Sequence, residues 1–87
     1  LETSVMMHYR SELVNLEIAG EGKSKSFNIE SLNKKVGWVP RDWSKTSEDT
    51  GVGNPRKASA QKGAEYANVV TNKIAMLFNE LVNKNLY

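Results

Sequence analysis

The sequence predicts a mostly helical chain with a long irregular loop, belonging to a larger fold. Three observations lead to this prediction. Residues 19–53 are polar and broken, and a connection this long is uncommon inside a compact domain of only 87 residues. The segment 38–63, rich in Trp, Asp and Gly, is costly to order and buries little apolar area by itself. The helix that follows carries an apolar stripe that only a short first helix could cover.

The first element is expected within residues 1–17. Apolar side chains such as Val5 and Tyr9 fall near helical spacing, and a helix is expected to end at Tyr9 or Arg10. Ser11 is then expected to cap a short second turn. The first residue is not Met and no leading segment precedes the helix, which favours a piece of a longer protein.

The second part, residues 18–53, is expected to be a loop region. Gly20 and Gly22 form a turn signal. The segment 27–32 fits either a short strand or a helical turn. Residues 36–40 are expected to be extended, because Val39 precedes a proline and is kept out of the helical region.

The third part, residues 54–84, is expected to be one long helix. Asn54 is a favourable N-cap, and Pro55 would occupy the first helical position, where its missing N–H is no loss. Small side chains early in the apolar stripe predict close backbone packing there, and bulky ones later predict a deeper groove. The stripe is formed by Ala60, Ala64, Ala67, Val70, Ile74, Leu77, Phe78 and Leu81.

Composition restricts the function classes. The chain has no cysteine, which excludes disulfides and thiolate metal sites and fits a reducing, cytoplasmic location. The net charge is +2, and the lysines of residues 23–35 are interrupted by Glu30, so solvated loop charge is favoured over a nucleic-acid surface. No apolar run approaches the roughly 20 residues that a membrane span requires, and the first residues lack the basic flank and apolar core of a signal peptide. Neither nucleic acid nor membrane is therefore expected as a partner.

Few residues could carry chemistry. Either Glu2 is stabilised by the helix dipole, with Thr3 or Ser4 capping free N–H groups, or Glu2 projects into a catalytic site. His8 is the only histidine, and a packed or half-exposed side chain is favoured over a metal ligand, since zinc needs three or four convergent ligands. No metal site is expected within this chain.

Carboxylates flank Trp43 in the irregular loop. Asp42, Glu48 and Asp49 could act in acid/base chemistry, but their spacing favours ordinary surface acidity. Trp38 and Trp43 are the stronger candidates. Two tryptophans on a loop are expected to anchor it in a groove of the same fold or of a neighbouring subunit.

Arg56 and Lys57 are expected in the first turn of the last helix, where positive charge opposes the helix dipole. Either an acidic neighbour or a bound anion could compensate, or both side chains are simply solvated.

Two separated motifs resemble the creatininase (creatinine amidohydrolase) family. Residues 1–17 resemble the segment after that family's active-site histidine, through Glu–Thr–Ser at residues 2–4 and Glu–Leu–Val at residues 12–14, although Ser11 replaces a frequent proline. The loop before the last helix resembles a Thr–Gly–Val–x–Gly–Asp–Pro segment followed by an Ala–Ser–x–x–Lys–Gly helix start, with Asn54 in the place of the aspartate. The matching positions are Thr50, Gly51, Val52, Pro55, Ala58, Ser59, Lys62 and Gly63.

The resemblance implies an α/β fold. This chain would be the C-terminal fragment of a three-layer α/β/α sandwich, and the complete protein would be a homo-oligomer, often a hexamer. Family members use two zinc or manganese ions to activate water and hydrolyse an amide C–N bond in a small molecule. Their metal ligands and histidine come from upstream regions, so the expected partner of this chain is the remainder of the same protein. Glu2 is the only catalytic residue that carries over, and Trp38 and Trp43 would lie near the substrate or a subunit contact.

One alternative belongs to a different class of function, that of interaction modules. A small helical interaction module could use the exposed stripe of the last helix to bind a partner.

Overall fold

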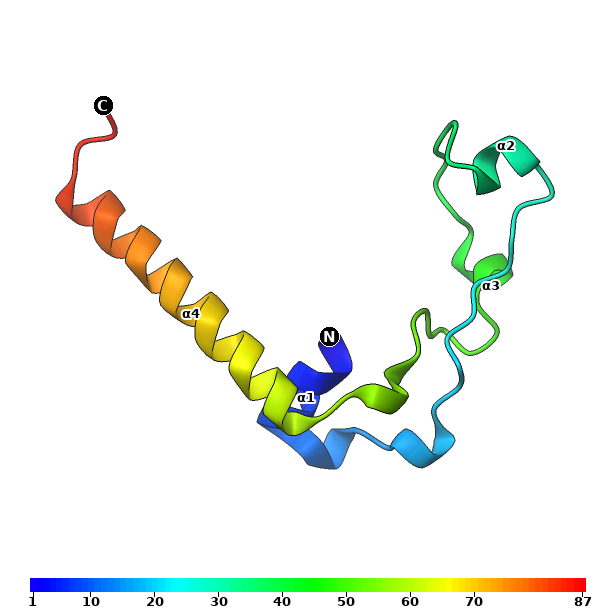
Figure 1. The fold of residues 1–87 in the computed structure, drawn as a ribbon, viewed down its shortest axis with the longest axis horizontal. Coiled ribbons are helices and arrows are strands. Elements are labelled where there is room, and N and C mark those ends of the chain that lie inside the picture. Colours follow the sequence, from blue (N-terminus) through cyan, green and yellow to red (C-terminus); the bar gives the residue numbers. More distant parts are fainter. The chain divides into compact units, whose positions relative to one another are not determined.

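The computed structural model describes residues 1–87 and contains helices and loops but no strand. The α-helices are α1 (Glu2–Arg10), α2 (Glu30–Asn33), α3 (Trp43–Thr46) and α4 (Ala60–Asn83) (Figure 1). Three single 3-10 turns accompany them, at Ser11–Leu13, Leu16–Ile18 and Pro55–Lys57. The predicted mostly helical character is confirmed, whereas the sheet of a three-layer sandwich is not contained in these residues.

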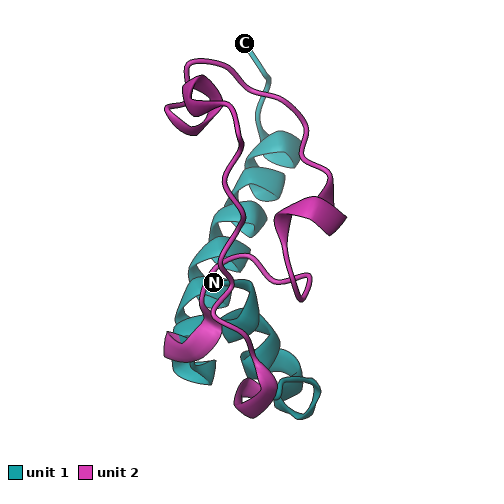
Figure 2. Cartoon of the chain, turned by 90° about the vertical axis from the view of Figure 1, so that its right-hand side faces the viewer, with its two compact units in different colours: residues 1–15, 58–87 teal, residues 16–57 magenta.

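The chain divides into two compact units, which we describe separately. Unit 1 comprises Leu1–Asn15 and Ala58–Tyr87, and unit 2 comprises Leu16–Lys57; Figure 2 shows them in teal and magenta. Unit 1 is the pair of helices α1 and α4, whose sequences lie at opposite ends of the chain. Unit 2 consists of loops with the short helices α2 and α3.

Helix α1 ends where the sequence predicts, at Arg10. Arg10 itself leaves the helical conformation at φ −147° and ψ 69°, and Ser11 begins the following 3-10 turn. Ser11 is therefore part of that turn and is not its cap. Its carbonyl accepts a hydrogen bond from the N–H of Val14 at 3.1 Å, which closes the turn.

The predicted start of the long helix at Asn54 and Pro55 is wrong. The Asn54 side chain accepts a bond from the Arg56 N–H at 3.0 Å, but this caps only the 3-10 turn Pro55–Lys57. Ser59 has extended backbone angles, φ −151° and ψ 151°, which interrupt any continuous helix. Its side chain accepts from the Lys62 N–H at 3.3 Å, so Ser59 is the N-cap of α4.

Apolar surface remains largely uncovered in this chain. No hydrophobic residue is buried, and the C-terminal half of α4 exposes its bulky side chains, with Leu77 at 51% exposure. Only α1 packs against α4, and it covers the alanine-rich beginning of the stripe, where Ala64, Ala67 and Val70 are partly covered. The expectation that apolar residues of the last helix stay uncovered is confirmed for its C-terminal half, whereas α1 partly covers the beginning of the stripe.

Backbone hydrogen bonds connect separate loop segments of unit 2. The Lys25 N–H donates to the Thr46 carbonyl and the Gly53 N–H donates to the Gly22 carbonyl, both at 2.8 Å. Gly22 has φ +65°, and a Cβ there would lie 2.2 Å from the Gly53 oxygen. Glycine is required at this position by both the left-handed backbone and the close approach. Of the two structures that the sequence allows for residues 27–32, the helical turn is the one formed, as part of α2.

Candidate functional site

Glu2 is the first residue of α1 and belongs to unit 1. Its side chain is exposed, and its carboxylate makes no ion pair or hydrogen bond with the other described residues. A carboxylate in the first turn is favoured by the helix dipole. Both interpretations from the sequence, dipole stabilisation and projection into a site, are compatible with this position.

The neighbouring serine has a role that the sequence interpretation missed. Leu1 is the N-cap position of α1 and no side-chain cap hydrogen bond is present, so the expected capping by Thr3 or Ser4 is wrong. The Ser4 hydroxyl instead accepts a hydrogen bond from the Ser59 N–H at 3.2 Å. Ser4 is only 4% exposed, and it joins α1 to the N-cap of α4.

Gly63 forms the other half of this contact. A Cβ at Gly63 would lie 1.8 Å from the Ser4 carbonyl oxygen and 2.9 Å from the Val5 nitrogen, both of them backbone atoms. No side chain larger than hydrogen fits there without moving α1. The predicted close backbone packing at the beginning of α4 is confirmed, although Gly63 was not recognised as its centre.

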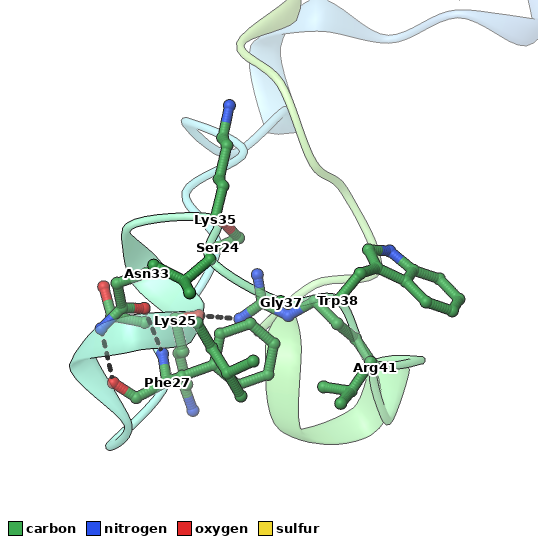
Figure 3. Close-up of a pocket in the computed structure, with 12 residues that line it drawn as sticks. Ser24, Lys25, Phe27, Asn33, Lys35, Gly37, Trp38 and Arg41 are labelled. Carbon is green, nitrogen blue, oxygen red and sulfur yellow. Dashed lines mark hydrogen bonds between the residues drawn. The ribbon is translucent and has the colours of Figure 1, made fainter.

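Trp38 lies at the edge of an open pocket in unit 2. The pocket has a volume of about 750 Å³, and apolar and basic side chains line most of it. Trp38 is 83% exposed, and Figure 3 shows its indole standing apart from the Phe27 ring. The main lining side chains are Lys25, Phe27, Leu32, Lys35, Val36, Trp38, Val39 and Arg41.

Two sets of interactions fix one wall of this pocket. Asn33 accepts from the Phe27 N–H at 2.9 Å and donates to the Phe27 carbonyl at 2.8 Å. The Arg41 guanidinium lies 4.3 Å from the centre of the Phe27 ring and also donates to the Lys25 carbonyl. A cation over an aromatic face is electrostatically favourable. Asn33, Phe27 and Arg41 therefore mainly stabilise the loop itself (Figure 3).

The basic side chains of the pocket do not converge on one point. Figure 3 shows Lys35 and Lys25 extending in opposite directions, and the Arg41 guanidinium is already occupied. Small-molecule sites need a few polar groups directed at one position. The pocket thus presents apolar surface for packing and lacks a convergent ligand-binding set.

Trp43 is the first residue of α3, in unit 2, and its indole N–H donates to the Thr50 carbonyl at 3.1 Å. This bond anchors the indole to the chain's own loop, while the ring remains 52% exposed. Trp43 therefore has one fixed edge and one apolar surface available for a further contact. Thr50 adopts a left-handed backbone with φ +68°, an uncommon conformation for a β-branched residue.

The carboxylates near Trp43 serve local structure. Asp42 is the N-cap of α3 and accepts from the Ser44 hydroxyl at 2.6 Å and from the Ser44 N–H at 3.1 Å. These bonds, led by the Ser44 hydroxyl, hold the pKa of Asp42 below its ordinary value, although partial desolvation opposes them. Asp49 accepts from the Gly51 N–H at 3.1 Å. Local capping explains both carboxylates without acid/base chemistry.

Arg56 and Lys57 precede α4 and do not lie in its first turn, so the expected opposition to its dipole is wrong. The cause is the later helix start at Ala60. An acidic neighbour is nevertheless present within unit 2, because a guanidinium nitrogen of Arg56 lies 4.0 Å from a carboxylate oxygen of Glu21.

The side chains present do not fit a metal centre by themselves. No group of three His, Asp or Glu residues is placed to hold an ion. His8 is exposed and packs its ring against Tyr9, with ring centroids 4.6 Å apart. Separately, none of the helices has the length and apolar character needed to cross a membrane.

The predicted site residues are divided between the two units: Glu2 belongs to unit 1, and Trp38 and Trp43 belong to unit 2. The residues that sequence reasoning missed are Ser59 as the α4 cap and the contact between Ser4 and Gly63. Ser59 carries a recognisable signal, since serine is a preferred N-cap. The partner of Ser4 is 55 residues distant in sequence, and no local pattern indicates such a contact.

Comparison with known proteins gives a consistent result. The family model described as creatininase, creatinine amidohydrolase, matches residues 1–78. A crystal structure of a provisionally named creatinine amidohydrolase from Bacteroides fragilis NCTC 9343 is similar, with 58% sequence identity and a TM-score of 0.88. The similarity covers 99% of this chain and 34% of that protein, so this chain spans about a third of the relative's length. No protein of curated function matches this chain.

Proposed function

Because this chain belongs to the creatininase family, we propose that it is the C-terminal part of a metal-dependent amidohydrolase. The reaction is hydrolysis of the C–N bond of a non-peptide or cyclic amide resembling creatinine. The 87 residues are inactive alone and require the remainder of the same protein.

One observation supports this proposal most strongly. No hydrophobic residue of the chain is buried, yet the chain resembles about a third of a longer solved relative at 58% identity. An apolar stripe ending in Leu77, Phe78 and Leu81 requires cover in a folded protein. The remaining two thirds of an amidohydrolase would supply that cover.

Glu2 is the proposed catalytic residue of this chain. Its carboxylate is exposed and unpaired, so it is available to groups contributed by other parts of the protein. Zinc or manganese would be held by side chains outside this chain, since the donors present here do not form a site. Glu2 would act beside that site as a charged or proton-accepting group.

Trp38 and Trp43 are proposed to contact either the substrate or a neighbouring subunit. Both indoles expose apolar area, and exposed tryptophans are frequent anchors at interfaces. The complete protein is proposed to be a cytoplasmic homo-oligomer, as in the hexamers of the family. The alternative of a small helical interaction module is not favoured, because the family match covers α1, the loop region and α4 as far as residue 78.

A chimeric protein tests the proposal. The upstream two thirds of the Bacteroides fragilis relative are fused to this chain in place of the matching segment, and hydrolysis of creatinine and other small amides is measured with zinc or manganese. We expect metal-dependent hydrolysis by the fusion and none by the 87 residues alone. A folded, metal-loaded fusion without activity on any amide would contradict the proposal.

A matched pair of substitutions tests the role of Glu2 in the same fusion. Glu2→Gln removes the charge with little change in shape and is expected to lower kcat about 100-fold or more. Glu65→Gln is the control, since Glu65 accepts from Gln61 on the surface of α4 and an amide can replace it. Equal activity of the two variants would exclude a catalytic role for Glu2.

A further inference from the structure

We propose that the contact of Ser4 and Ser59 with Gly63 is a positioning device that fixes the location of the Glu2 carboxylate. This inference rests on the proposed function and assigns positioning residues to it. The three residues form the connection between the first turn of α1 and the first turn of α4. None of them is proposed to touch substrate.

Ser4 and Gly63 are the buried residues of unit 1, which has no buried hydrophobic residue. The two helices therefore approach each other most closely at a polar and a glycine position. Apolar packing elsewhere in unit 1 is partial, with Ala64, Ala67 and Val70 only half covered.

Two hydrogen bonds meet at Ser59. The Ser59 N–H donates to the Ser4 hydroxyl, and the Ser59 hydroxyl accepts from the Lys62 N–H. One residue therefore caps α4 and holds α1 at the same time. Since α1 has no side-chain cap of its own, this bond is what ties its first turn to another element.

The contact between Gly63 and Ser4 leaves no room for an added atom. Glu2 lies two residues before Ser4, which corresponds to about 3 Å of rise along a helix. A Cβ at residue 63 would lie 1.8 Å from the Ser4 oxygen, and real Cβ contacts essentially never fall under 3.0 Å. An added methyl group must therefore displace the first turn of α1 by more than about 1 Å. A displacement of that size in a reacting group can lower a rate about 100-fold.

The test uses the active fusion described above, carrying Gly63→Ala. We expect kcat to fall about 100-fold while KM for the amide changes by less than about threefold, because binding groups elsewhere are unmoved. Gly37→Ala is the matched control, since a Cβ there meets only the Leu32 side chain at an ordinary 3.7 Å. It should retain the kcat of the unsubstituted fusion.

A second variant covers the case in which Gly63→Ala fails to fold. Ser4→Ala removes the acceptor of the Ser59 N–H without adding volume, and we expect a kcat loss of about tenfold with the circular dichroism spectrum preserved. Ser31→Ala, at an exposed serine of α2, is its control. Retention of full kcat by the folded Gly63 variant, or by the Ser4 variant where the former does not fold, overturns the inference. Absence of activity in the unsubstituted fusion overturns the proposed function and this inference with it.

Discussion

At the scale of single residues, two exposed carboxylates of unit 2, Asp42 and Asp49, act as local caps. Asp42 receives two bonds from Ser44, and Asp49 receives one from Gly51. Side-chain capping of this kind was foreseeable for Asp42, because aspartate before a helical turn is a preferred N-cap. The hydrogen bond between Ser4 and Ser59 could not be predicted from the sequence. The two residues are 55 positions apart, and only folding brings them together.

The pKa of Asp42 provides a prediction at this scale. The Ser44 hydroxyl favours the ionised carboxylate, so Asp42 should titrate below its ordinary 3.8. A folded pKa below the unfolded value means that this contribution to stability is present above the unfolded pKa and is lost as pH falls through the folded pKa. Carboxyl-carbon NMR titration of the chain measures it directly.

Ser44→Ala provides the comparison for this titration. The substitution should raise the midpoint of Asp42, since it removes the principal cause of the shift. Glu12 is an internal control, because its lowered pKa has a separate cause in the Arg10 side chain. An unchanged Asp42 midpoint in the Ser44 variant would show that the hydroxyl bond is not the cause.

At the scale of elements, α4 was predicted with the correct end and the wrong beginning. The end is determined by apolar periodicity, which extends through Leu81 and Val82. Two residues of N-cap type, Asn54 and Ser59, lie five positions apart near its beginning. Asn54 caps the 3-10 turn Pro55–Lys57, and Ser59 caps α4. The extended backbone of Ser59, whose N–H bonds to Ser4, favours the later start. Tertiary contact therefore decides between two local signals of similar strength.

Removing each cap separately distinguishes the two helix starts. Ser59→Ala should destabilise the first turn of α4 by about 1 kcal/mol and accelerate hydrogen exchange at the Lys62 amide about fivefold. Asn54→Ala should leave that amide unchanged, because Asn54 caps only the preceding 3-10 turn. The opposite pattern, with Lys62 responding to Asn54, would place the helix start where the sequence alone suggested.

At the scale of the whole molecule, apolar surface exceeds what the chain can cover. Sequence reasoning reached this conclusion from the length of the stripe relative to the first helix. What covers these side chains could not be predicted, because a local sequence pattern specifies an apolar face and not its partner. The described residues contain no strand, so the sheet of the expected sandwich stays a prediction.

Leu77→Ala separates the two environments of α4. In the active fusion the substitution should cost about 2–5 kcal/mol of folding free energy, as for a core leucine. In the 87-residue chain it should cost less than about 0.5 kcal/mol, since Leu77 is half exposed there. Asn72→Ala, a polar position of α4 outside the stripe, serves as the control in both proteins, and denaturant unfolding monitored by circular dichroism measures all four changes. Equal costs for Leu77→Ala in the two proteins would contradict a covering role for the upstream part.

Amide hydrogen exchange across Ile74–Leu81 tests the central claim most directly. Exchange is recorded for the 87-residue chain alone and for the same residues within the fusion. We expect weak protection in the isolated chain, because nothing in it shields this part of α4, and protection at least tenfold stronger in the fusion. Strong protection in the isolated chain as a monomer, unchanged in the fusion, would show that these residues complete their own fold.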